Sequence, residues 1–234
     1  MKFVKLGAAV LVTFVIIAGI AIPTSSSPSS LFQFPVIPGL EERARNIFFH
    51  VPTAWTTCLA FLVSMFFGIR YLRTKNIEYD IWSVSSASLG FLFCFLATVT
   101  GSVWAKFNWG SFWNWDPRET SIFVLLLIYG AYFALRSSLE VEETRAKLSA
   151  VYSIVAGLTS PFFIFVMPRI MSGLHPGAKG DSGGSTPVAQ LHMPPNMLTV
   201  FLLSLLGFSL LFVWMLNVRV RLAKLEYQQS THHA

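Results

Sequence analysis

The stretch LTVFLLSLLGFSLLFVWMLNV, residues 198–218, decides the fold class of this chain. It carries no charged residue, and it is as long as the roughly 20 apolar residues that a helix needs to cross a bilayer core of about 30 Å. Its apolar residues run continuously and do not alternate with polar ones, as they would in the strands of a membrane barrel. The stretch therefore predicts a transmembrane α-helix.

Five further blocks of this kind precede it along the chain, at residues 6–22, 47–69, 81–103, 120–135 and 148–166. Open strand edges cannot lie in lipid, because their backbone groups would have no hydrogen-bonding partner. We therefore expect an all-α integral membrane protein, a six-transmembrane-helix bundle. It would form a single membrane domain over residues 1–234, with a tryptophan-rich outer loop at 104–119.

The overall composition agrees with this expectation. Hydrophobic residues make up 54% of the chain and charged residues 12%, about half of the ~25% usual in soluble domains. The mean hydropathy is +0.60. These values exclude a soluble enzyme domain, a disordered chain and a disulfide-stabilised scaffold.

The basic residues predict the orientation in the membrane. Eleven Lys and Arg residues fall in the two termini and in the connections that share their side, against six in the segments 23–46, 104–119 and 167–197. The positive-inside rule then places both termini in the cytoplasm and these three segments outside. The net charge of +6 follows from this asymmetry and requires no nucleic-acid partner.

The first block also resembles a secretory signal peptide, since Lys2 and Lys5 precede it and the Ser-rich stretch 24–30 follows it. No clean small-residue cleavage site follows, so we favour a retained helix. Cleavage would leave five spans with the same orientation.

The outer segment Trp104–Thr120 reads WAKFNWGSFWNWDPRET and holds four of the seven tryptophans. An interfacial aromatic belt explains one or two aromatic residues at a helix end. Six aromatic residues in this one segment indicate a large flat ligand as an alternative; they are Trp104, Phe107, Trp109, Phe112, Trp113 and Trp115.

The residues that follow have the pattern of a helix start. Asp116 is a good N-cap, Pro117 suits the first helical position and Glu119 completes a capping box. Arg118 fits less well, because a cation at the positive end of a helix needs a nearby anion. That anion could be Glu119 or the carboxylate of a ligand, which Arg grips with two hydrogen bonds.

Three histidines map to the outer side of the predicted bundle. His50 lies just inside the second span, where an ionisable residue is a functional candidate by default. Its structural alternative is a hydrogen bond to a carbonyl that Pro52 leaves free. His175 and His192 lie in the last outer segment and are equal candidates on local grounds.

Heme is a ligand that suits this set of residues. The set consists of two imidazoles, an aromatic platform and two arginines, Arg45 and Arg118. Heme requires axial nitrogen donors, flat apolar contact and cations for its propionates. Zinc fits less well, because it requires three or four closely spaced ligands and has no use for tryptophan.

Three strings carry a resemblance to a known family. Residues 109–116 (WGSFWNWD) resemble the tryptophan-rich WWD signature of the heme-handling proteins of cytochrome c biogenesis, of the CcmC (heme exporter) and CcsA types. Residues 45–52 (RNIFFHVP) are similar to the family segment that carries the first heme-ligating histidine, and Leu174-His175 to the second. The resemblance covers nearly the whole chain, and the span number fits the small CcmC-type members.

The resemblance implies a heme b site at the outer face of the bacterial cytoplasmic membrane, on the periplasmic side. His50 and His175 would bind the iron, and the WWD segment would present the heme, with Trp109, Gly110, Phe112, Trp113, Trp115 and Asp116. The family works with two ATP-binding-cassette subunits, a small membrane adaptor and a periplasmic heme chaperone. Its role is transport and assembly, and no residue is expected to be catalytic.

Some alternatives stay open at this point. Phe112 stands where some relatives have Trp, and the match fades after His175, which leaves His192 as the alternative ligand. Residues 117–120 (PRET) match CcsA-type members more closely than CcmC-type ones, so the pathway is open. A cytochrome b subunit of a quinol oxidoreductase and a heme-free transporter are the rival classes.

Overall fold

The computed structural model describes residues 1–175 and 193–232. Within them, six helical stretches are long and apolar enough to cross a membrane. Each of the six apolar blocks of the sequence falls on one of these stretches, which confirms the all-α membrane bundle. The elements are α1 (Lys2–Ala21), η1 (Glu41–Phe48), α2 (His50–Thr74), α3 (Ile77–Trp109), α4 (Pro117–Ser137), α5 (Glu142–Pro161), the π-helix η2 (Phe162–Val166), α6 (Met167–Ile170) and α7 (Pro195–His232).

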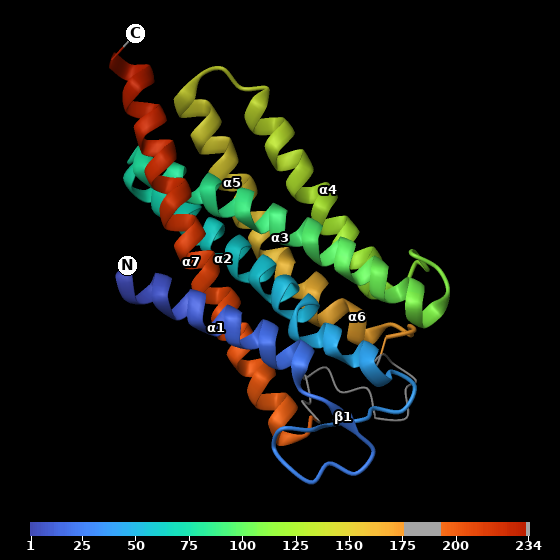
Figure 1. Ribbon diagram of the computed structural model, residues 1–234. Helices are drawn as coiled ribbons and strands as arrows, with labels where there is room; N and C mark the ends of the chain where they lie inside the picture. The colour runs from blue at the N-terminus through green and yellow to red at the C-terminus, as the bar shows by residue number, and fades with distance from the viewer. Residues whose placement is uncertain (176–192, 233–234) are drawn as a thin grey trace.

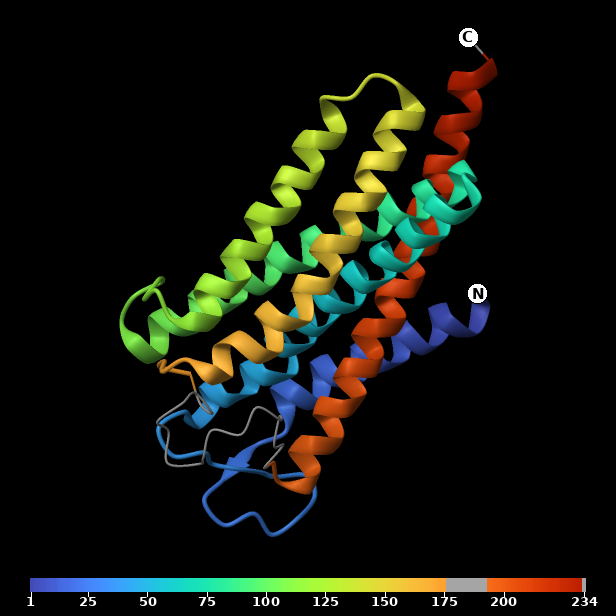
Figure 2. The ribbon, with the colours of Figure 1, turned by 180° about the vertical axis from the view of Figure 1, so that it is seen from behind.

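Helix α2 lies in the middle of the bundle, against α3, α5 and α7 (Figures 1 and 2). Small polar side chains hold α2 and α3 together: the hydroxyls of Ser64 and Ser83 lie 3.2 Å apart, and Ser86 donates to the carbonyl of Ala60 at 2.8 Å. Such contacts suit helices in lipid, where burial of apolar surface does not drive association. Helices α4 and α5 pack on one side of this centre, and α1 packs along α7 on the other.

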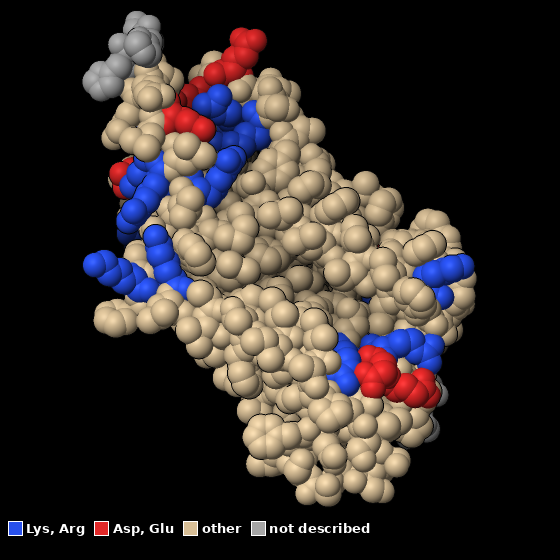
Figure 3. Space-filling view, in the orientation of Figure 1, with Lys and Arg blue, Asp and Glu red and all other residues tan. Residues whose placement is uncertain are grey.

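The connections divide into two groups at opposite ends of the bundle. The N-terminus of α1 and the C-terminus of α7 point toward one end, and the described parts of segments 23–46, 104–119 and 167–197 gather at the other (Figures 1 and 2). Lys and Arg side chains cluster at the end that carries the termini, above a belt almost free of charge (Figure 3). The described parts of the three segments therefore share one end, as predicted.

A short parallel pair of strands closes the connection between α1 and η1. Strand β1 (Thr24–Ser25) pairs with β2 (Phe34–Pro35), with Thr24 opposite Phe34. The ring of Phe34 packs 5.4 Å from that of Phe48, in a cluster that joins α1 to α7. The strands thereby tie the loop to the bundle.

The tryptophan-rich segment differs from the predicted loop over 104–119. Helix α3 continues through Trp109 and ends at Gly110, whose φ of 82° suits a glycine C-cap. Helix α4 starts at Pro117 with Asp116 as its N-cap and the predicted capping box to Glu119. The connecting loop is therefore 110–116, because the helical backbone of α3 is interrupted only where Gly110 takes a left-handed conformation.

Candidate functional site

A cavity of about 320 Å³ lies at the end of the bundle that holds the WWD segment, within the roughly 300–1,000 Å³ range of small-molecule sites. Its walls come from α2, α3, α4, η2, α6 and α7 and are mostly apolar. Among its polar lining residues are His50, His175, Arg118 and Arg169. The structure therefore brings together two of the predicted ligand histidines, from segments far apart in the sequence.

His50 begins α2 and packs against α3. Its Nδ1 lies 3.0 Å from the hydroxyl of Thr100, and Thr100 donates its own proton to the carbonyl of Leu96 at 2.8 Å. The hydroxyl therefore accepts from His50, so Nδ1 carries the proton and Nε2 keeps its lone pair. The backbone of Gly101 makes room for the ring, since a Cβ there would lie 2.9 Å from His50 Cε1.

The alternative role of His50, as partner of a carbonyl freed by Pro52, is wrong. Pro52 has no N–H to donate to the carbonyl of Phe48, and that carbonyl instead accepts from the Ser204 hydroxyl of α7. The carbonyl that Pro52 leaves free therefore has a hydrogen-bond partner other than His50.

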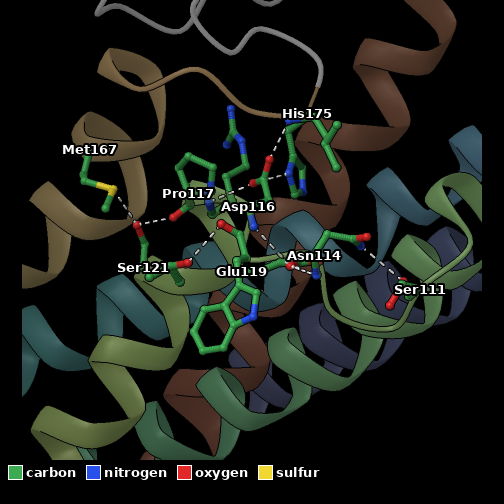
Figure 4. Close-up of polar contacts among 12 residues, drawn as sticks. Ser111, Asn114, Asp116, Pro117, Glu119, Ser121, Met167 and His175 are labelled. Atoms are coloured by element: carbon green, nitrogen blue, oxygen red, sulfur yellow. Dashed lines mark hydrogen bonds and ion pairs between the residues drawn. The ribbon is translucent and has the colours of Figure 1, made fainter.

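His175 is held by Asp116 and by two tryptophans. Its Nδ1 lies 2.7 Å from Asp116 Oδ1 (Figure 4). The Trp104 ring stacks on the imidazole at 5.9 Å, and Trp109 meets it edge-on at 4.7 Å. With Nδ1 engaged by a carboxylate, the ring can offer Nε2 to a metal, as in many metal sites.

Asp116 both caps helix α4 and pairs with His175. Its Oδ1 also accepts from the backbone N–H of Arg118 at 2.9 Å, and its Oδ2 from that of Leu174 at 2.6 Å (Figure 4). Burial opposes ionisation, but the hydrogen bond and charge of His175 and the two backbone N–H groups outweigh it and lower the pKa of Asp116 to about 2. The carboxylate is thus ionised at neutral pH and accepts the His175 proton.

The aromatic residues of the WWD segment divide into two groups. Trp113 lines the cavity and Trp109 packs on His175. Phe107 and Trp115 are each 70% exposed and Phe112 is 57% exposed. Trp115 has a φ of 56°, a left-handed conformation that is unusual for a bulky residue. One group therefore builds the site, and the other presents an apolar surface beside it.

Not every predicted site residue reaches the cavity. Arg45 forms an ion pair with Glu42, donates to the carbonyl of Gly19 at 2.9 Å and lies over the Phe34 ring, so it ties η1 to α1. Gly110 caps α3 at the edge of the loop. His192 lies outside the described residues.

Sequence reasoning missed several residues of the site: Thr100, Trp104 as a histidine neighbour, and Arg169. Arg169 follows the fifth apolar block and precedes His175 by six positions. In the sequence, Arg169 contributed only to the predicted orientation in the membrane. Thr100 gave no signal, because a threonine inside a span usually bonds its own helix.

The donor set fits a metalloporphyrin. Two imidazole nitrogens keep free lone pairs at one apolar cavity, and tryptophan rings support one of them. Arg118 adds a buried Nε with no hydrogen-bond partner among residues 1–175 and 193–232. A flat molecule with a central metal and peripheral acid groups would satisfy all three features.

Comparisons with known proteins agree with this chemistry. A family model described as "CcmC: Heme exporter protein C" matches residues 1–234. The "Heme exporter protein C" of Rhodobacter capsulatus is 27% identical over 81% of this chain and 76% of its own length. That of Paracoccus denitrificans is 29% identical over 75% and 70%. A "Cytochrome c biogenesis protein CcsA" from Cuscuta reflexa is 36% identical over 37% of this chain and 29% of its own length.

Proposed function

The chain belongs to the heme exporter protein C family, and we propose that it binds heme b transiently and presents it to a periplasmic heme chaperone. At the coarser level, it is a multi-pass membrane protein that handles heme for cytochrome c biogenesis, in a transport and assembly role. In the proposal, the end of the bundle with the cavity faces the periplasm, and both termini lie in the cytoplasm of a bacterial cell.

The observation that carries the proposal is the meeting of His50 and His175 at one cavity. They come from α2 and from the segment after α6, and each ring has its Nδ1 engaged by a protein oxygen. That arrangement leaves both Nε2 atoms as iron ligands and fixes both ring planes. Bis-imidazole ligation would hold the iron without a covalent bond to the porphyrin, so the cargo can be released.

The exposed aromatic residues supply the presenting surface of this proposal. Phe107, Phe112 and Trp115 lie on the same segment as Trp113, which lines the cavity. A partner that docks on these three side chains would therefore be adjacent to the bound heme. We propose the heme chaperone as this partner, with the ATP-binding-cassette subunits and a small membrane adaptor contacting the bundle elsewhere.

The test is a reduced-minus-oxidised visible spectrum of the purified protein, recorded beside a His50→Ala, His175→Ala double variant. A bis-histidine b-type spectrum in the wild type that disappears in the double variant supports the proposal. A double variant that keeps the spectrum contradicts the ligand pair, and a wild type that binds no added heme contradicts the function. Size-exclusion chromatography of both proteins checks that they remain folded.

A further inference from the structure

Two residues of α2 line the cavity and also reach the surface of the bundle. Val51 is 36% exposed and Trp55 is 40% exposed, and both belong to the cavity wall that holds the histidines. Helix α7 packs against α1, α2 and α3, whereas η2 packs against α4, α5 and α6. Helix α2 therefore separates α7 from η2 at this level (Figure 2). The cavity thus has a side mouth, which lies over Val51 and Trp55 between α7 and η2.

The rim of this side mouth is apolar on both sides. Leu202 and Leu206 of α7 are exposed, as are Phe162 and Val166 of η2. These residues belong to the apolar blocks 198–218 and 148–166, and neither block contains a charged residue. Uncharged stretches of this length lie in the hydrocarbon core of a bilayer. The side mouth therefore opens toward lipid, whereas Arg169 and His175 line the cavity near its outer end.

The side chain of Trp55 closes the side mouth. Its ring centroid lies 6.2 Å from that of Phe165 in η2, and its Nε1–H donates to the hydroxyl of Ser209 in α7 at 3.1 Å. Ser209 donates its own proton to the carbonyl of Leu205 at 2.7 Å, so its oxygen is free to accept from the indole. Hydrogen bonds between membrane helices are modest in strength. One such bond can therefore break while both helices keep their packing.

The η2 side of the mouth stands on an irregular backbone. Helix α5 ends at Pro161 and continues directly as the π-helix Phe162–Val166, and Pro168 follows in α6. Proline removes a helical hydrogen bond, and π-helical turns occur mostly at functional positions. The segment that carries Phe165 is thus less constrained by regular helical bonding than α7 is.

We propose that the side mouth is the entrance for the cargo: heme enters the cavity sideways from the bilayer, and Trp55 is the gate. This inference rests on the proposed function. A porphyrin is a flat and largely apolar body, so it dissolves in lipid and can pass a rim that carries no charge. The entrance is then separate from the exposed aromatic residues of the WWD segment, where the heme is presented.

The experiment measures both directions of the exchange. The heme-depleted full chain is reconstituted in phospholipid vesicles, heme is dissolved in the same bilayer, and the Soret band gives the rate of uptake. An excess of apomyoglobin outside the vesicles then gives the rate of release. A gate sets only the height of the barrier, so Trp55→Ala should raise both rates by the same factor, about two- to tenfold for the loss of one hydrogen bond. The affinity, which is the ratio of the two rates, should stay at the wild-type value.

Two milder variants test the hydrogen bond itself. Trp55→Phe keeps an aromatic ring without the N–H group, and Ser209→Ala removes the acceptor. Each should raise both rates by less than Trp55→Ala does. The double variant should match the single ones, because all three lack the same bond. The matched control is Trp214→Ala, since Trp214 lies on α7 beside Lys5, away from the cavity. Its rates should equal those of the wild type.

Each other outcome contradicts a definite part of the argument. Wild-type rates in Trp55→Ala would mean that heme enters from the aqueous end, which overturns the side entrance. Faster release with unchanged uptake would make Trp55 a wall of the binding site and not a gate. Slower uptake would mean that a lipid chain fills the opened mouth, and this also overturns the proposal. A wild type that takes up no heme contradicts the proposed function itself.

Discussion

The imidazole of His50 donates to the hydroxyl of Thr100, because the Thr100 proton is committed to the carbonyl of Leu96. A side chain that merely bonds its own helix thus selects the tautomer of a histidine on the neighbouring helix. This hydrogen bond leaves Nε2 of His50 as an acceptor at the cavity. Thr100 is therefore a positioning residue.

Thr100→Val should therefore weaken heme binding while Thr100→Ser keeps it. Valine has a similar shape but cannot accept the Nδ1 proton, and loss of such a partner typically costs about 10–100-fold in metal affinity. Heme titration of the two variants measures the difference. Equal affinities would show that the orientation of His50 does not depend on the hydroxyl.

Gly101→Ala should displace His50. The added Cβ would lie 2.9 Å from the imidazole Cε1, closer than carbon atoms approach in folded proteins. We expect loss of the bis-histidine spectrum with little change in helix content by circular dichroism. Gly130→Ala on α4 is the matched control, since a Cβ there meets no atom of another described segment within 4 Å and the spectrum should be unchanged.

Asp116→Asn should lower stability in a pH-dependent manner. The lowered pKa of Asp116, about 2, means that ionisation stabilises the fold by about 2 kcal/mol above the unfolded pKa near 3.9. This contribution is lost as the pH falls toward 2. Asparagine remains a good N-cap, so the variant isolates the charge.

Thermal unfolding of the heme-free protein in detergent checks this expectation. The difference in Tm between wild type and Asp116→Asn should be constant from pH 7 to pH 5 and shrink below pH 4. A difference that instead grows on acidification would mean that His175 and the backbone N–H groups do not stabilise the ionised carboxylate.

Trp109→Ala and Trp115→Ala should separate heme retention from heme presentation. Trp109 contacts the His175 ring, so its removal frees that ligand and should reduce the heme content of the purified protein. Trp115 is mostly exposed, so its removal should leave the heme content unchanged and reduce transfer to the chaperone. Loss of heme in both variants would contradict the division between the two groups.

Arg136→Gln should destabilise the bundle without touching the site. Arg136 pairs with the buried Asp80 across α3 and α4, with one of the two hydrogen bonds at 2.8 Å. Breaking a buried pair leaves an uncompensated charge and typically costs about 3–5 kcal/mol. A lower Tm with an unchanged heme spectrum is the expected pair of results, and a Tm at the wild-type value would refute it.

The sequence predicted the helices well because each apolar block is long and nearly free of charge. The cap at Asp116 was also predictable, since capping is local. The end of α3 was not, because aromatic residues at a membrane surface suit a helix as well as a loop. Residues such as Thr100 and Arg169 could not be found, because their roles depend on which helices become neighbours.

The double use of Asp116 couples the position of His175 to the first turn of α4. One carboxylate closes the first turn of α4 and fixes His175 and Leu174. A displacement of the loop at 110–116 would therefore reach His175 through this one carboxylate, without any contact inside the cavity.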